Sequence, residues 1–477
     1  MTPQVPRLWR FLLFKAFFDT LVSANIIEVI YTRNKGDKME SFLAFLHANA
    51  LPITAAILII AYIFIVIDKI PKMTIALIGA CFTILLGPLS QSPNAPHHLY
   101  FIHYIDFGVL ILLISMMITV NISAKTGMFD YAAIKLIKAT KGHPFWLLFV
   151  IGALTAVISA FLDNVTTVIL MIPISFIIAK ELSISPIPLL ITEIISSNIG
   201  GTATLIGDPP NIIIGSKAGF TFMDFLLELT DIVSFIFVVS ICILYYMFRK
   251  QLKTTPEQRA NIQNLSTEGI IKDRQGMIRS IIVLSIIVLG FLTHDITHVS
   301  NYLIALLGAS ILLLFEKPEE ILPHVEWNTL FFFMGLFTII GGFEAAGGIK
   351  LIAQWVIDIT NGQQSAASML IIWVSCILSG IIDNIPYTAT MAPLILQIQN
   401  TFSAEYAHPL WWSLSLGACL GGNLTIIGAA ANVIVSEAAA KRGYPIKFVS
   451  YLKYGIIVTF VSLILSSGYI YLRFLRG

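Results

Sequence analysis

Charged side chains are scarce in this sequence, and their scarcity indicates the class of protein. Only 12% of the 477 residues are Asp, Glu, Lys or Arg, whereas 57% are apolar. A soluble domain carries about 25% charged residues, so we expect a protein that crosses a membrane several times. The apolar runs that approach the ~20 residues needed by a spanning helix are 51–67, 73–89, 104–122, 222–248, 279–292, 299–315, 327–342 and 454–472.

Other absences exclude whole classes of function. The four cysteines are scattered through apolar segments, which argues against a disulfide framework. The sequence has no Cys/His cluster with zinc spacing, no GxxxxGK(S/T) phosphate loop and no visible pair of nucleophile and base. Its net charge is only +2, and no basic tract extends beyond the loops between helices. We therefore expect a protein embedded in the lipid bilayer. We expect it to have no enzyme activity, no built-in ATPase, no cofactor and no nucleic-acid partner.

Two Asp-Asn pairs are the most informative residues that are present. Asp163-Asn164 lies in FLDNVTTVILMIP, and Asp383-Asn384 lies 220 positions later in GIIDNIPYTATMAP. An ionisable side chain at membrane depth costs several kcal/mol, so it is a functional-site candidate by default. Two such pairs in matching contexts predict one site built by an internal repeat.

The match between the two halves continues on both sides of these pairs. Five crossings per half would give the halves opposite orientations, which is the inverted-topology repeat of many secondary transporters. The pairs at offset 220 are Asp106-Phe107 with Glu326-Trp327, Gly127 with Gly347, and Pro173 with Pro393, and those at offset 221 are Gly200-Gly201 with Gly421-Gly422, Thr204 with Thr425, Gly207 with Gly428, and Asn211 with Asn432.

Each half also contains a predicted re-entrant hairpin and an interrupted helix. The hairpins are expected over 145–181 and 367–399, and the interruptions over 197–211 and 418–432. Glycine pairs and Asp-Pro-Pro inside an apolar span cannot continue a regular helix. Unwound backbone at membrane depth is tolerated only where protein or a wet cavity satisfies it, so these breaks are expected to line the site.

The basic residues predict the orientation in the membrane. The polar stretch 249–278 is rich in Lys and Arg, which places this central loop in the cytoplasm. The lysine-bearing stretch 125–141 is then a cytoplasmic connection, and 343–366 an external one. No cleavable signal peptide is recognisable, and residues 8–31, apolar but with three charged residues, are expected to span the membrane or to lie in its interface.

The long motifs resemble one known family. SAFLDNVTTVILMIP, SSNIGGTATLIGDPPNIII, HVEWNTLFFF, IIDNIPYTATMAP and GACLGGNLTIIGAAANV closely resemble the P-protein branch of the arsenite-permease and sodium/proton-antiporter family. That family belongs to the ion-transporter superfamily, which also holds the citrate and dicarboxylate carriers. The resemblance covers about residues 50 to 475 in matching order.

The resemblance implies an all-α polytopic protein of the inner or plasma membrane, with about 11 transmembrane helices, two re-entrant hairpins and two interrupted helices. It implies a homodimer in which a transport part slides against a scaffold part as an elevator. The implied domains are an N-terminal extension with a first membrane helix (1–42), repeat 1 (43–248; scaffold 43–142, transport 143–248), a cytoplasmic linker (249–278), and repeat 2 (279–477; scaffold 279–366, transport 367–477).

The polar residues of the hairpins and breaks form the predicted site. Asp163 and Asp383 could be simple helix caps, but Ser or Thr would cap without a buried charge, which favours a binding role. Asp208 precedes two prolines and suits a cap equally well; its counterpart Ala429 has no side-chain oxygen. The predicted ion-binding set is Asp163, Asn164, Asn198, Thr202, Thr204, Asp208, Asn211, Asp383, Asn384, Thr388, Asn423, Thr425 and Asn432.

Protons and metal ions have their own candidates within this region. The proton-carrier candidates are Asp163, Asp383 and Glu193; Glu193 could equally reach the cytoplasmic face. A Na⁺ site is predicted at Asp163, Asn164, Asp383 and Asn384, where the two asparagines could instead hold the hairpin tips.

The predicted core favours a cation as substrate. It contains carboxylates but no Lys or Arg, and hard cations prefer carboxylate, carbonyl and hydroxyl oxygens. We therefore expect secondary active Na⁺/H⁺ antiport, in which Na⁺ and H⁺ are transported ions. The alternative is an arsenite, other oxyanion or organic-anion permease coupled to protons or Na⁺, with an external ATPase subunit only for an arsenite exporter. A channel is the third hypothesis.

Overall fold

The computed structural model describes residues 45–46, 48–67, 69–86, 100–265 and 267–476. Every regular element in these ranges is a helix. Nine described helices are long and apolar enough to cross a membrane, or ten if the bent pair Asn301–Leu313 and Pro318–His324 is one span. An all-helical polytopic membrane protein is thereby confirmed. The span expected at 8–31 and the 1–42 extension lie outside the described residues.

The chain divides into two compact units, and the smaller one contains few helices. It holds α4 (Ala50–Ile67) up to residue 64, α5 (Lys72–Leu86), the short η2 (Tyr100–Tyr104) and most of α18 (Trp327–Ala345). A Cβ atom on Gly335 of α18 would lie 2.6 Å from the backbone of Ala76 on α5. The absence of a side chain at Gly335 therefore lets these two helices approach closely.

The larger unit contains residues 65–68, 107–330 and 349–477, and with them all the predicted site residues. Its first group of helices is α6 (Phe107–Lys125), α7 (Met128–Ala139), α8 (Pro144–Phe161), α9 (Asn164–Glu181), α10 (Ile187–Thr202), α11 (Pro209–Ala218), α12 (Phe222–Phe248) and α13 (Pro256–Gln263). The remaining elements are α14 (Arg274–Leu292), α15 (His294–Thr297), α16 (Asn301–Leu313), α17 (Pro318–Ile321), η3 (Leu322–His324), α19 (Gly348–Ile359), α20 (Gln364–Ile382), α21 (Asn384–Thr401), α22 (Ala404–Gly421), η4 (Ile426–Gly428), α23 (Ala430–Lys441), α24 (Phe448–Ile470) and η5 (Tyr471–Leu475).

Each of the two predicted hairpin regions contains a pair of helices joined at an aspartate. Helices α8 and α9 meet at Asp163, and α20 and α21 meet at Asp383. The Asp163 carboxylate accepts a hydrogen bond from the backbone of Thr166, and the Asp383 carboxylate accepts one from the backbone of Ile385. Both aspartates are therefore N-caps, as the cap interpretation of the sequence required.

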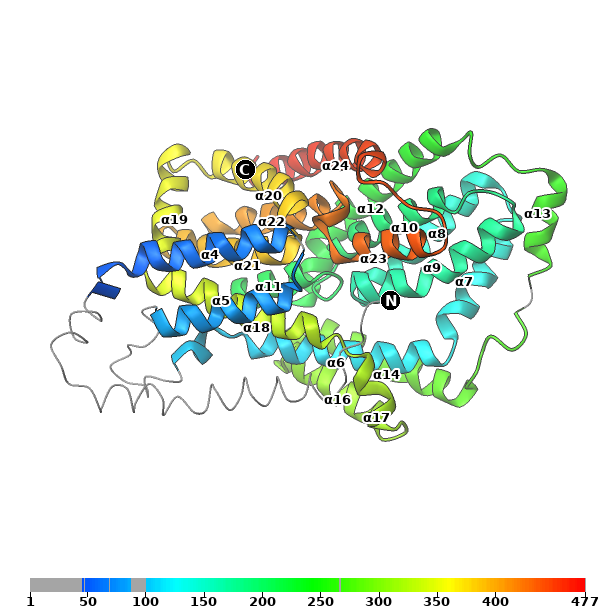
Figure 1. Ribbon diagram of the computed structural model, residues 1–477, viewed down its shortest axis with the longest axis horizontal. Coiled ribbons are helices and arrows are strands. Elements are labelled where there is room, and N and C mark those ends of the chain that lie inside the picture. Colours follow the sequence, from blue (N-terminus) through cyan, green and yellow to red (C-terminus); the bar gives the residue numbers. More distant parts are fainter. Residues whose placement is uncertain (1–44, 47, 68, 87–99, 266, 477) are drawn as a thin grey trace. The chain divides into compact units, whose positions relative to one another are not determined.

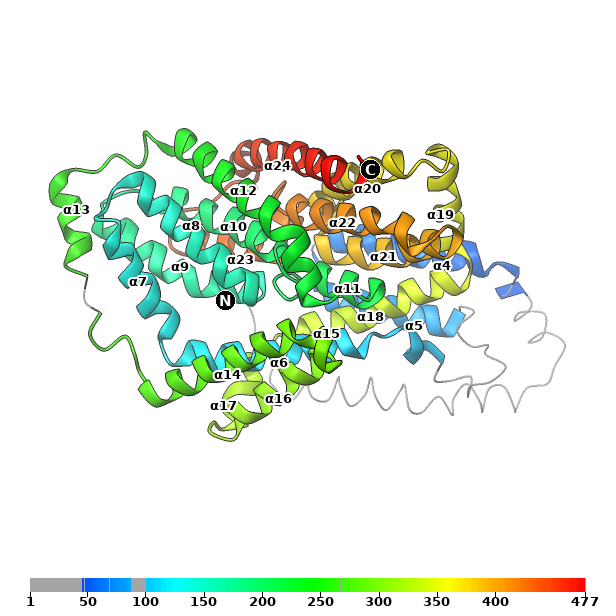
Figure 2. The same cartoon turned by 180° about the vertical axis from the view of Figure 1, so that it is seen from behind.

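The predicted interruptions separate α10 from α11 and α22 from α23. Helix α10 packs on α8 and α22 packs on α20, and both pairs lie side by side in the two views (Figure 1, Figure 2). A Cβ atom on Gly200 would lie 2.1 Å from the Ala156 carbonyl oxygen, and one on Gly421 would lie 2.5 Å from that of Cys376. Glycine is needed at both positions because backbone meets backbone there.

Two short helices were missed by the sequence analysis, which treated 125–141 and 343–366 as connections. Helix α7 follows Gly127 and α19 begins after Gly347, and both glycines have positive φ (82° and 84°). The matched glycines are the signal that could have revealed a matched pair of helix starts, because only glycine adopts this conformation without strain. Both helices are too short to span a bilayer.

Candidate functional site

Asp208 is the carboxylate on which the two hairpins converge. It lies in the break before α11, is 1% exposed, and makes no side-chain cap bond to the described helix. The Asn384 amide nitrogen donates to both carboxylate oxygens, at 3.2 and 3.1 Å. The Asn164 amide and the Cys419 thiol also lie against this carboxylate. Asp208 thus occupies the N-cap position with proline at the first helical position, as the sequence indicated, but its carboxylate makes no cap bond and points to the hairpin residues instead.

Within the described ranges, no cationic side chain forms an ion pair with this carboxylate. The ion pairs that the described residues form all lie elsewhere, and the charged group that acts on Asp208 is the carboxylate of Asp383. A buried carboxylate without a cationic partner must be protonated, or bind a cation, to avoid a large desolvation cost. The site is therefore suited to exchange one positive species for another.

Four buried asparagines continue the polar cluster next to Asp208. The Asn164 amide donates to the side-chain oxygen of Asn198 (3.3 Å), and the Asn198 amide donates to those of Asn423 (2.9 Å) and Asn432 (3.0 Å). The chain of amides joins the first hairpin to both breaks. A fully satisfied buried network of this kind fixes one arrangement of the backbone around it.

Asn211 and Asn432 hold the two breaks in the same way. The Asn211 amide donates to the carbonyl oxygens of Gly201, Thr202 and Thr204, at 3.3, 3.1 and 2.9 Å. The Asn432 amide donates to those of Gly422 and Thr425, at 2.7 and 2.9 Å. These two residues satisfy carbonyl groups that lose their helical partners at the break, so their main role is structural.

The threonines near the breaks also bond within the protein. The Thr204 hydroxyl donates to the carbonyl oxygen of Ala160, and the Thr425 hydroxyl donates to that of Gly380 at 2.5 Å. The Thr202 hydroxyl donates back to Asn198 in its own helix at 2.7 Å. Among the four threonines of the predicted set, only Thr388 has a buried hydroxyl without a hydrogen-bond partner among the described residues. Of the predicted threonines, Thr388 is thus the one left available for a ligand.

The two hairpin aspartates have different surroundings. Asp163 accepts from both the backbone (2.9 Å) and the hydroxyl (2.6 Å) of Thr166, and it interacts electrostatically with Glu326. Asp383 interacts with Asp208 instead, and it has a φ of 97°, a conformation that is costly for a residue with a side chain. The predicted symmetric pair of aspartates is therefore asymmetric in its partners.

Glu326 and several serines are site residues that the sequence reasoning missed. Glu326 precedes α18 and had been noted only as a marker of the repeat, although its position before an apolar helix was a usable signal. The Ser159 hydroxyl donates to the Asn164 side chain at 2.5 Å and to the Ser197 carbonyl at 2.8 Å. The Ser379 hydroxyl donates to the Ala418 carbonyl at 2.5 Å. Ser159 and Ser379 differ by the same offset of 220, which could have identified them.

Glu193 lies within α10 and is 0% exposed, so it does not reach the surface of the protein. The Ser175 hydroxyl on α9 donates to its Oε1 atom, and its Oε2 atom has no partner among the described residues. The described chain has no group of three or more His, Cys, Asp or Glu residues that could hold a metal. A monovalent cation, which needs one carboxylate and neutral oxygens, remains compatible with the Asp208 cluster.

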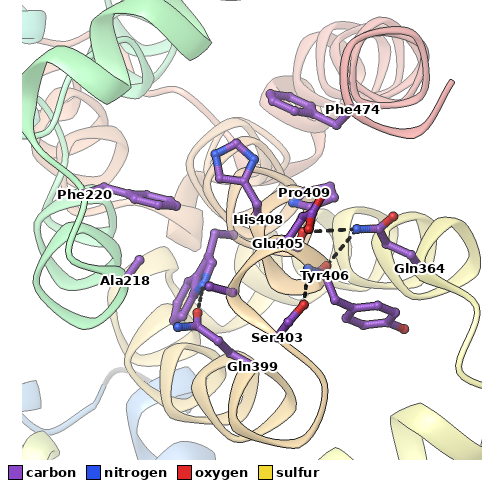
Figure 3. Close-up of a pocket in the computed structure, with 12 residues that line it drawn as sticks. Ala218, Phe220, Gln364, Gln399, Ser403, Glu405, Tyr406, His408, Pro409 and Phe474 are labelled. Atoms are coloured by element: carbon purple, nitrogen blue, oxygen red, sulfur yellow. Dashed lines mark hydrogen bonds between the residues drawn. The ribbon is translucent and has the colours of Figure 1, made fainter. Parts of the chain in front are cut away.

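A separate pocket of about 680 Å³ opens at the start of α22 (Figure 3). Phe220, His408, Trp411 and Phe474 form its aromatic walls, and Gln399 accepts a hydrogen bond from the Trp411 ring nitrogen at 2.9 Å. None of the predicted ion-binding residues lines it. This pocket is therefore not the place where the buried carboxylates lie.

Comparison with known proteins gives consistent matches to transporters. Residues 62–417 match the family model described as citrate transporter. The chain is 39% identical over 428 residues to the 46 kDa membrane protein of Mycobacterium leprae (89% of this chain, 99% of that one). It is 31% identical over 506 residues to the P protein of Mus musculus (89% and 60%). These matches confirm the resemblance to the P-protein branch.

Among solved structures, the crystal structure of the Alcanivorax borkumensis YdaH transporter is similar in fold. The TM-score is 0.55 at 12% sequence identity, and the match covers 83% of this chain and 95% of that one. At this identity the likeness concerns the arrangement of helices alone.

Proposed function

The chain belongs to the citrate transporter family, and from this premise we propose that it exchanges a small monovalent cation, with Na⁺ first, for protons at Asp208. It is a multi-pass membrane protein and a secondary transporter of the ion-transporter superfamily, not an enzyme. The observation that carries the proposal is a buried carboxylate, contacted from both hairpins, with no Lys or Arg beside it in the described residues.

The chemistry of the cluster favours a cation over an organic anion. Asp208 and Asp383 would repel a citrate-like anion, and no cationic side chain among the described ion pairs offsets them. A site for such an anion needs charge-assisted donors. In the proposed site Asp208 supplies a charged oxygen and the Asn164 and Asn384 amides rotate to supply neutral ones, which are ligands that hard cations prefer.

The transport cycle is a competition at one carboxylate. Asp208 holds either a proton or the cation. In both states the charge of its carboxylate is neutralised, so the loaded site can move through the membrane. We propose that the two halves form an inverted repeat with re-entrant hairpins, within a homodimer of the cell membrane that works as an elevator. The proposal also includes eleven membrane spans, a division into scaffold and transport parts, and a cytoplasmic position for the loop 249–278. The equivalent bonds of Asn211 and Asn432 support it, since they give both halves the same break.

Export of neutral arsenite or another oxyanion acid is the second candidate. It is favoured by the Cys419 thiol, which lies against Asp208 and 3.4 Å from the Asn211 side-chain oxygen. A thiol is a ligand for soft centres and is of no use to Na⁺. In this alternative the asparagines would bind the acid hydroxyls by hydrogen bonds.

Reconstitution with a trapped pH dye tests the two candidates. Pulses of Na⁺, Li⁺ or K⁺ are expected to drive proton movement in liposomes with the wild-type chain and not with Asp208→Asn. Protons compete with the cation, so the apparent KM for Na⁺ should rise as pH falls, by up to about tenfold per pH unit where Asp208 is mostly protonated. No cation-dependent flux at any pH would contradict antiport, and arsenite-driven flux that Cys419→Ser abolishes would replace it.

A further inference from the structure

A second buried carboxyl, Glu193, lies in the larger unit and has no role in the cation site described above. It is fully buried in α10, receives one hydrogen bond from Ser175, and leaves Oε2 without a described partner. An isolated carboxylate in such a place would be very costly, whereas a neutral acid would not. The geometry therefore suits a carboxyl that carries a proton.

No charged group offsets Glu193 from the helices packed around it. Helices α8, α9, α12, α22 and α23 pack against α10, and only the Ser175 hydroxyl acts on Glu193 as a specific partner in the described chain. The charged or titratable groups on these helices are Lys180 and Glu181 on α9, Asp224, Glu228, Asp231, Cys242, Tyr245 and Tyr246 on α12, Glu405, Tyr406, His408 and Cys419 on α22, and Glu437 and Lys441 on α23, with none on α8.

A row of polar side chains joins Glu193 to the Asp208 cluster. Ser197 lies four residues after Glu193, on the same face of α10, and its hydroxyl is 3.3 Å from the Asn164 side-chain oxygen. Asn164 in turn lies against Asp208. On the facing helix α9, the buried Thr167 hydroxyl has no partner among the described residues. We call this row, made of Glu193, Ser175, Thr167, Ser197 and Asn164, the α9–α10 polar seam.

The second half of the chain shows that packing alone does not require this seam. At the equivalent positions Glu193 is replaced by Leu414, Ser175 by Ile395, and Ser197 by Ala418. All three replacements are buried to at least 99%. The equivalent helix pair therefore packs with apolar residues at these three positions, although Thr167 and Asn164 are matched by the polar Tyr387 and Asn384. Packing therefore does not require Glu193, Ser175 or Ser197.

The seam leads away from Asp208 toward the end of α9 and α10 that touches the central loop. Asn261 of α13, in that loop, donates to the Glu181 carbonyl at the end of α9, at 3.2 Å. Glu193 lies six residues into α10, about 9 Å from its start at 1.5 Å per residue. It is the one titratable residue of α10 and lies between Asp208 and the start of that helix.

We propose that Glu193 is a second proton-binding carboxyl, which receives protons from the central-loop side and delivers them to Asp208 along the α9–α10 polar seam. The proposal rests on the cation–proton exchange proposed at Asp208. In the first step, one proton from water binds the Glu193 carboxylate. This proton then moves to the Asp208 carboxylate through water and the seam hydroxyls, and Glu193 is a carboxylate again. No other bond is broken.

Labelling with a hydrophobic carbodiimide tests the buried proton directly. The full chain is treated in liposomes over a pH series, and the adducts are located by peptide mass spectrometry. Reaction is expected at Glu193, decreasing as pH rises, because the reagent needs a protonated carboxyl in apolar surroundings. Glu437, which is exposed, is the internal control and should stay unmodified, and Glu193→Gln should lose the adduct. Absence of the adduct at Glu193 across the series would overturn the proposal.

Two flux measurements distinguish a proton carrier from a packing residue. Glu193→Leu copies the second half, and Glu193→Gln keeps the shape of the side chain. Both are expected to slow cation-driven proton flux by about tenfold or more, while exchange of labelled for unlabelled Na⁺, which needs no proton, changes by less than about twofold. An equal loss of both fluxes in folded protein would make Glu193 structural. If the wild-type chain shows no cation-driven flux, the proposed antiport fails, and the labelling result still decides whether Glu193 holds a buried proton.

Discussion

The two halves of the larger unit agree in the bonds that shape the backbone. Thr204 and Thr425 donate to carbonyl groups exactly 220 residues apart, those of Ala160 and Gly380. Gly200 and Gly421 each meet the backbone of the preceding hairpin helix. These groups build two equivalent breaks, which are the framework of the site.

The halves differ in the residues that carry charge. Asp208 is matched by Ala429, and Glu193 by Leu414. The hairpin aspartates are matched in sequence, but only Asp383 interacts with Asp208. The comparison teaches that the framework is symmetric, while the carboxyl groups to which we assign the ion chemistry lie mostly in the first half. Each position in one half thus provides a control for its equivalent in the other.

The largest expected effect comes from the carboxylate that only the first half has. Asp208→Asn keeps the size of the side chain but removes its charge, so cation-driven proton flux should fall by about a thousandfold, to the background of empty liposomes. The matched control Ala429→Ser adds one hydroxyl and should change flux by less than about twofold. Substantial flux in Asp208→Asn, with protein folded by size-exclusion chromatography, would remove the asymmetry on which the proposed function rests.

Adding one methyl group to either break should damage both halves alike. In Gly200→Ala the new Cβ would lie 2.1 Å from the Ala156 oxygen, and in Gly421→Ala 2.5 Å from the Cys376 oxygen. We expect each to destabilise the protein by about 3 kcal/mol, because backbone atoms must shift. Thermal unfolding in detergent measures this, with Gly468→Ala, which meets nothing within 4 Å, as control. A large effect in one half only would show that the frameworks are not equivalent.

The asparagine clamps should give a smaller and graded effect. Asn211→Ala leaves three carbonyl groups and the Ser415 hydroxyl without their partner, whereas Asn432→Ala leaves two carbonyl groups and the Asn198 amide. We expect losses of about 3 and about 2 kcal/mol in the free energy of unfolding, because buried groups without partners are costly. Equal destabilisation by the two variants, measured by the same unfolding assay, would contradict the difference in bond number.

Much of this framework could be predicted from the sequence. The offset of 220 to 221 located both helix pairs and both breaks, because glycine, proline and Asp-Asn in an apolar stretch have few structural explanations. Helices α7 and α19 were missed because the search was for apolar runs long enough to span a membrane, whereas both are short and clearly amphipathic, and short helices depend on tertiary packing.

The partners of the charged groups could not be predicted in the same way. Sequence spacing gave Asp163 and Asp383 equal roles, yet Asp208 is the carboxylate that Asn384 contacts, from 176 residues away. Such a contact depends on how two halves of the chain pack, which no local pattern encodes. The unequal pair Asp208 and Ala429 was the one signal, and it indicated a functional role for Asp208 only as one of two open interpretations.

The hairpin aspartates provide the finest test of the comparison. Asn is as good an N-cap as Asp, so Asp163→Asn and Asp383→Asn should both fold normally and differ only in charge. Asp383 interacts with Asp208, and Asp163 with Glu326. We therefore expect Asp383→Asn to change the apparent KM for Na⁺ by about tenfold, which corresponds to about 1.4 kcal/mol. The change in KM caused by Asp163→Asn should correspond to less than half of that energy. The direction is informative at a pH high enough that protons no longer compete: removal of the Asp383 charge makes a cation at Asp208 less favourable, so the KM should rise there. If Asp163→Asn has the larger effect, the exchanging carboxylate lies at the first hairpin and the assignment to Asp208 is wrong.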